Sequence, residues 1–149
     1  SWARRAILIR PPATVARTTR SMTNKKFEEL VAEAVEAIPE KFRAKLENVV
    51  FLAEKEPSAE HLEDTDTPEG ETLLGLQEGP TLGERKAYPW HLPNRIIIFQ
   101  NAHEDEARET GRSIAEVVRE TVWHEIAHFL GMDEREVEKA EERRQKRAA

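Results

Sequence analysis

The feature that most constrains this chain is a run of eleven residues, 124–134, with the sequence HEIAHFLGMDE. Two residues four apart lie on the same face of a helix, so His124 and His128 can bind one metal ion. Glu125 lies beside that face, where it can hold a water on the metal and accept its proton. Apart from Glu125, residues 121–130 carry no charge in a chain that is 35% charged. The run therefore predicts a helix buried around a polar stripe, which is the helical half of a zinc hydrolase site.

A catalytic zinc needs a third protein ligand and one open position. Gly131 suits the end of the helix, where a glycine with positive φ lets the chain turn back. Asp133 and Glu134 then follow His124 by nine and ten residues. We expect Glu134 to be the third ligand, with Asp133 as its rival. The competing interpretation is a half-buried helix with two histidines and no metal, and the glycine and the acids after it favour the metal.

Composition bounds the class of protein. A length of 149 residues suits one domain. The chain has no cysteine, so any zinc must be held by nitrogen and oxygen. No window is long and apolar enough for a membrane span, and no secretory signal is visible. Together these observations predict a cytoplasmic protein without a membrane partner.

Charge divides the chain into two parts. Residues 1–21 contain five arginines and no acid, which leaves a charge of −11 on residues 22–149 out of a total of −6. The acidic body disfavours nucleic acid as a partner. The basic arm has the composition of a transit peptide or of a nucleic-acid or membrane tail. We instead expect an upstream extension that is partly disordered, followed by one folded domain at residues 22–149.

Hydrophobic periodicity in the body predicts an α+β fold, with N-terminal helices, about three strands and a charged C-terminal helix. Three isoleucines at 96–98 indicate a strand that is buried on both faces. The expected elements are a helix at 24–38, a short helix from Pro39, a strand at 48–53, a helical turn at 57–62, strands at 73–79 and 92–100, a helix at 113–130 and a charged helix from Asp133.

From residue 22 to about residue 137 the chain resembles the small bacterial zincin-like metallopeptidases, also called mini-zincins. The segments that carry the resemblance are FEELV at 27–31, IPEKF at 38–42, LLGLQEG at 73–79, LPNRI at 92–96 and TVWHEIAH at 121–128. The resemblance implies a minimal zincin-like domain, in which a short three-stranded sheet backs the active-site helix. It also implies zinc held by His124 and His128, with Glu125 as the base. Similar chains have aspartate where this one has Glu134.

The function that this pattern favours is hydrolysis of peptide bonds, in which zinc polarises the carbonyl and Glu125 moves the proton. Besides zinc, a second group would have to stabilise the negatively charged oxygen of the reaction intermediate. The candidates are Tyr88, His91, Arg95 and His103, with His91 as first choice. Each of them can also be explained as a surface or packing residue. A peptide substrate would pair with an edge strand of the sheet, for which we expect residues 73–79, because Gly75 leaves room for a close backbone.

Two other functions stay open at this point. In the first, zinc only stabilises a small binding or regulatory module. In the second, the protein is a metal-dependent endoribonuclease, since bacterial rRNA-processing enzymes have a similar helix. Those enzymes have glycine at the position of Glu125 and histidine at the position of Glu134, and the acidic body disfavours RNA.

Overall fold

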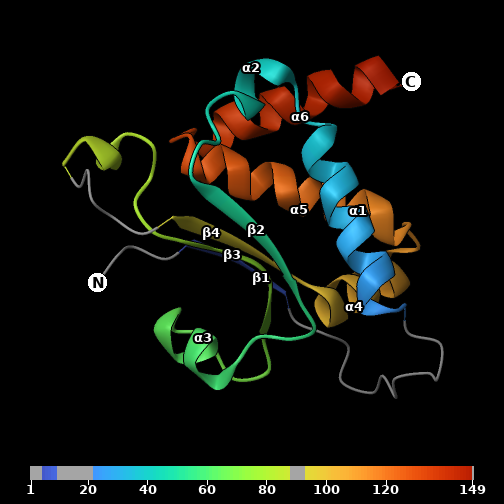
Figure 1. Cartoon of the computed structure of the whole chain (residues 1–149). Coiled ribbons are helices and arrows are strands. Elements are labelled where there is room, and N and C mark those ends of the chain that lie inside the picture. Colours follow the sequence, from blue (N-terminus) through green and yellow to red (C-terminus); the bar gives the residue numbers. More distant parts are fainter. Residues whose placement is uncertain (1–4, 10–21, 88–92, 149) are drawn as a thin grey trace.

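Four strands form one mixed sheet in the order β1-β3-β4-β2 (Figure 1). The computed structural model describes residues 5–9, 22–87 and 93–148. β4 is central, because it pairs in parallel with β2 and antiparallel with β3, and β1 pairs antiparallel with the other side of β3. The strands are β1 (Arg5–Ile9), β2 (Val49–Glu54), β3 (Thr72–Glu78) and β4 (Asn94–Phe99).

The sheet corrects the three strands that the sequence led us to expect. Three of its strands, β2, β3 and β4, lie where the hydrophobic pattern placed them. The fourth, β1, comes from the basic arm at residues 1–21, of which the structure describes residues 5–9. The α+β class is confirmed. The run at 96–98 is also confirmed as buried on both faces, since all three isoleucines are fully inaccessible.

Local sequence sets the helix boundaries. The hydroxyl of Thr23 accepts a hydrogen bond from the Lys26 N–H at 3.2 Å and so caps the first helix. The helix that begins at Gln100 follows β4 without a loop. The helices are α1 (Asn24–Glu36), α2 (Glu40–Arg43), α3 (Ala59–Asp64), α4 (Gln100–Thr110), α5 (Ile114–Phe129) and α6 (Glu134–Ala148), with a 3-10 turn, η1, at Glu84–Ala87.

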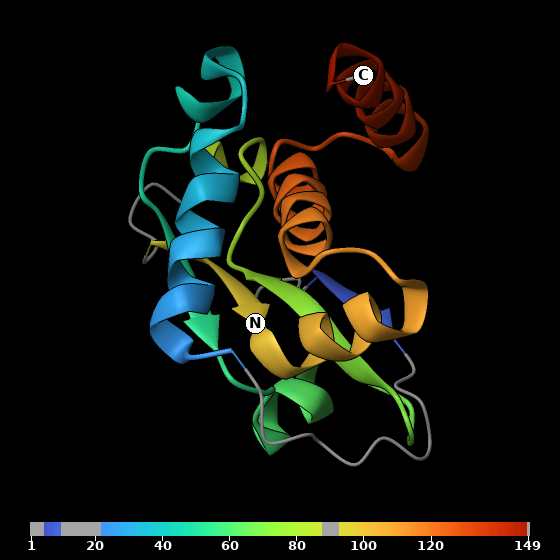
Figure 2. The same ribbon diagram turned by 90° about the vertical axis from the view of Figure 1, so that its right-hand side faces the viewer.

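Helices cover the sheet unequally. α1 and α5 lie side by side over one face, with α6 beyond them, whereas α3 lies on the opposite side (Figures 1 and 2). α5 contacts α1, α4 and the strands β1, β3 and β4. Among the described residues, no helix has the length and apolar character needed to cross a bilayer.

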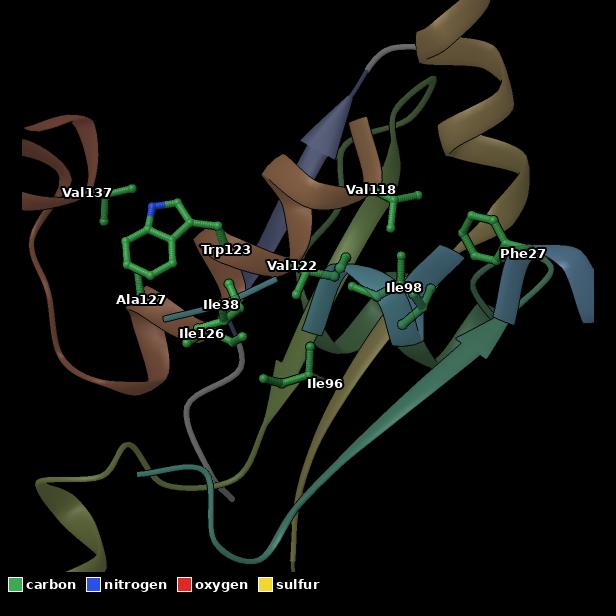
Figure 3. Close-up of a cluster of buried hydrophobic side chains, with 12 residues drawn as sticks. Phe27, Ile38, Ile96, Ile98, Val118, Val122, Trp123, Ile126, Ala127 and Val137 are labelled. Atoms are coloured by element: carbon green, nitrogen blue, oxygen red, sulfur yellow. The ribbon is translucent and has the colours of Figure 1, made fainter. Parts of the chain in front are cut away.

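The main core lies between α5, α1 and the sheet. Trp123 of α5 is completely buried, and its ring faces Val137 of α6 (Figure 3). The ring also lies 5.3 Å from that of Phe42. Burial of an aromatic side chain of this size contributes roughly 3 kcal/mol or more to stability. Trp123 therefore anchors α5, and through Val137 it holds the otherwise charged α6 against the domain.

Candidate metal centre

Helix α5 presents its two histidines as a narrow accessible stripe. The helix begins after Ser113, whose hydroxyl accepts a hydrogen bond from the Glu116 N–H at 3.1 Å. Within residues 121–129, every side chain is buried except those of His124 and His128, which are half-buried. Because the two lie one helical turn apart, their imidazoles share one face. This burial pattern, with only two nitrogen ligands open to solvent, fits a metal ion that binds at the surface of α5.

The chain turns back sharply at the end of α5, as the sequence predicts. Gly131 has φ +81°, a conformation that favours glycine. The Gly131 N–H donates to the His128 carbonyl, and the Met132 N–H donates to the Ala127 carbonyl, both at 3.0 Å. These two bonds are those of a Schellman motif. The turn brings the chain into α6 after only a few residues.

The two acids after this turn have different local roles. Asp133 caps α6, because its Oδ1 accepts a hydrogen bond from the Glu136 N–H at 2.8 Å. Glu134 is the first residue of α6, and its side chain lies outside the described part of the structure. Among the side chains that are described, no three histidines, aspartates or glutamates come together as a metal site. His124 and His128 therefore share one face of α5, and both their role as metal ligands and the identity of the third ligand stay predictions.

Glu125 points from α5 toward strand β3 and is completely buried. A Cβ atom added to Gly75 would lie 3.2 Å from Glu125 Cγ, 3.4 Å from Glu125 Oε1 and 2.9 Å from Thr121 Cγ2. Gly75 is therefore needed because side chains of α5, rather than another backbone, approach the strand at this point. The contact fixes the proposed base beside the middle of β3.

A comparison with known protein families identifies the family of this chain. A family model described as zincin-like metallopeptidase matches residues 46–144, which is about two thirds of the chain. The chain belongs to the zincin-like metallopeptidase family. Membership implies a zinc-type metal and a protein substrate. A search of curated proteins finds no match.

Strand β3 of this zincin-like domain is not an edge strand, which corrects our expectation for residues 73–79. It has β4 on one side and β1 on the other. The expectation was wrong because β1 comes from a segment that composition had placed outside the domain. Without β1, β3 would present a free edge next to Glu125.

His103 is a core residue and not a group that faces a substrate. It is fully buried, with Nδ1 2.7 Å from the Phe99 carbonyl and Nε2 2.8 Å from the Thr121 hydroxyl. Burial lowers the pKa of His103 to about 4, although the bond to Phe99 opposes this shift. Because the Phe99 carbonyl can only accept, the neutral ring donates from Nδ1, and its Nε2 faces the Thr121 hydroxyl, whose proton is shared with the Val117 carbonyl at 3.0 Å. The bond to Thr121 ties α4 to the turn of α5 that precedes Glu125.

Of the other three electrophile candidates, two stay untested and one lies away from the site. Tyr88 and His91 lie outside the described residues. Arg95 is exposed and forms an ion pair with Glu78 at 3.6 Å. Because side chains alternate across a strand, Arg95 lies on the face of the sheet opposite to Ile96, which packs with α5. Arg95 therefore points away from the site.

A polar anchor that the sequence did not reveal holds the loop after β3. Arg85 donates to the carbonyls of Glu47 and Asn48 at 2.7 and 3.0 Å and to Asn94 Oδ1 at 2.9 Å. The buried Asn94 donates in turn to the Pro80 carbonyl at 2.6 Å. Burial also lowers the pKa of Arg85 from its usual range, with Glu47 opposing this shift.

The same loop is joined to the end of α5. The Leu82 N–H donates to the Phe129 carbonyl at 2.8 Å, and the Arg85 guanidinium lies 4.8 Å from the centre of the Phe129 ring. The loop is thus fixed one residue from His128. The only signal for this in the sequence is Asn94, a polar residue that lies just before Arg95 and the isoleucines of β4.

Proposed function

We propose that this chain is a zinc-dependent metallopeptidase that hydrolyses peptide bonds. The observation that carries the proposal is the pattern on α5, where only His124 and His128 are accessible in an otherwise buried stretch of a chain from a metallopeptidase family. Two imidazoles on one helical face are the donors that zinc prefers in a chain without cysteine.

The proposed zinc ligands are His124, His128 and Glu134. Asp133 stays the rival, but its Oδ1 already caps α6, which supports Glu134. When bound, zinc would supply a Lewis acid that polarises the scissile carbonyl and acidifies water. The remaining chemistry is left to side chains of the domain.

Glu125 is the proposed general base. Its carboxylate lies between α5 and the middle of β3, in a site from which bulk water is excluded. There it can accept the proton of the attacking water and later deliver it to the leaving amine. Oxyanion stabilisation by His91 or Tyr88 stays part of the proposal, with His91 as first choice.

The test compares two carboxylates on one helix. Glu125→Gln should bind as much zinc as the wild type but hydrolyse fluorescently labelled casein at least about 100-fold more slowly, because it cannot accept a proton. Glu120→Gln is the matched control, since Glu120 lies on α5 but forms an ion pair with Arg112 at 2.6 Å. It should keep both zinc and activity.

Two results would contradict the proposal. Normal turnover by Glu125→Gln would remove Glu125 from the mechanism. A wild type with one zinc per chain and no hydrolysis of casein would instead support the non-catalytic zinc-stabilised module.

A further inference from the structure

Strand β1 pairs with the side of β3 that β4 leaves open, beside the candidate site. Its residue Ile7 is the register partner of Gly75, the same residue whose Cβ position meets Glu125. Helix α5 also contacts β1 directly. Neighbouring strands are about 4.8 Å apart, so β1 lies one strand spacing from the residue that touches the proposed base.

The described structure is a closed arrangement of the site. Glu125 is completely buried, although a general base must be reached by water and by substrate. Ala6 and Ile7 of β1 are half-buried and pack against the cluster that includes Leu73 and Leu76 of β3. Leu8, by contrast, is 40% exposed. Among the described side chains of β1, those of Ala6 and Ile7 hold the strand in place together with its backbone pairing.

An extended peptide substrate would need the same place. The free edge of a sheet offers unpaired N–H and C=O groups that pair with any extended chain, largely independently of sequence. β1 already makes this pairing, in the antiparallel sense, along the register Arg5↔Gln77 to Ile9↔Thr72. Substrate and β1 cannot occupy the edge of β3 together.

We propose that β1 is a tethered competitor of the peptide substrate, which keeps the site closed until it leaves the edge of β3. This inference rests on the proposed peptidase function. Residues 10–23 link β1 to α1 in the same chain, so β1 acts at an effective concentration on the order of millimolar. If the edge is free in about one molecule in ten, the apparent affinity for a peptide falls about tenfold.

A reversible lock on β1 tests the competition in the full chain. The chain has no cysteine of its own, so Ile9→Cys together with Thr72→Cys introduces one defined disulfide. These two residues are register partners at the end of the β1–β3 pair, and opposite residues of antiparallel strands lie within disulfide reach. Oxidised and reduced forms of one protein are then compared, with wild type under the same reductant as the control.

The first readout is binding rather than hydrolysis. The probe is a fluorescently labelled peptide with the sequence of residues 3–10, ARRAILIR. We expect the reduced form to bind it at least about tenfold more tightly than the oxidised form. Equal affinity of the two forms would overturn the proposal. A reduced form that dimerises in size-exclusion chromatography without binding the peptide would also overturn it, because the edge would then pair with a second copy.

A second pair of variants gives the opposite perturbation. Ile7→Asp places a charge at a half-buried position of β1 and should release the strand. Leu8→Asp is the matched control, because this neighbour is exposed. Ile7→Asp should bind the labelled peptide more tightly than Leu8→Asp, while circular dichroism shows both folded. No difference between the two folded variants would contradict the proposal.

Hydrolysis of labelled casein separates this inference from the proposed function. If the locked form binds peptide poorly and no form hydrolyses casein, the competition stands and the peptidase proposal fails. If locked and reduced forms hydrolyse casein at the same rate, the peptidase proposal stands and the competition is refuted.

Discussion

Substitution of Gly75 by alanine tests the contact that positions the proposed base. The added methyl group would lie 2.9 Å from Thr121 Cγ2 and 3.2 Å from Glu125 Cγ. Both neighbours belong to buried side chains of α5. Carbon atoms normally approach to 3.5 Å or more, so either these side chains or the backbone of α5 or β3 must move.

The structure sets the size of the effect. Overpacking of one methyl group in a core costs roughly 1–3 kcal/mol. Rotation of Thr121 away from the new methyl would break its 2.8 Å hydrogen bond to His103, at a further cost of about 1 kcal/mol. We therefore expect Gly75→Ala to lower the free energy of unfolding by about 2–3 kcal/mol.

Urea denaturation measures this loss, and Gly83→Ala is the control, because no heavy atom lies within 4 Å of a Cβ at that glycine. The control should stay within about 0.5 kcal/mol of the wild type. Gly75→Ala should also hydrolyse labelled casein more slowly, since Glu125 is displaced. Wild-type stability and activity in Gly75→Ala would refute the close packing of β3 against α5.

Four further variants test other parts of the account. Between pH 7 and pH 4.5 the metal-free protein should lose about 2 kcal/mol of unfolding free energy through His103. The reason is that His103 takes up a proton near pH 6.5 in the unfolded chain but only near pH 4 in the folded chain. In urea titrations at the two pH values, His103→Gln should remove that loss. Asn94→Ala should lower the free energy of unfolding by about 2 kcal/mol, since it leaves Arg85 without one of its acceptors and removes the donor to Pro80; a melting temperature equal to that of the wild type would argue against the anchor. Asp133→Asn keeps an oxygen that can cap α6, so it should leave zinc affinity unchanged in a chelator competition, whereas Glu134→Gln should lower it at least about tenfold; the reverse order would make Asp133 the ligand.

The sequence predicts the parts of this fold that local patterns determine. α5 follows from its apolar periodicity and from Gly131, whose positive φ and Schellman bonds are those expected of a helix end. β4 follows from its isoleucines, all of which are buried.

The remaining parts depend on partners that are distant in sequence. β1 has five residues, four of them apolar, within a basic arm, and its partner residues lie 63 to 72 positions later. No local pattern indicates such a pairing. Likewise, Arg85 binds backbone carbonyls of residues 47 and 48, which every residue carries. Apart from the polar Asn94 at the start of β4, the sequence therefore contains no sign of this anchor.

The measurement that tests the central claim most directly is the zinc content per chain. Elemental mass spectrometry of protein purified without chelator or nickel resin would be compared with His124→Ala. We expect close to one zinc in the wild type and none in the variant, since His124 is one of the two accessible imidazoles on α5. A wild type that holds no zinc even after zinc is added back would contradict the metal centre.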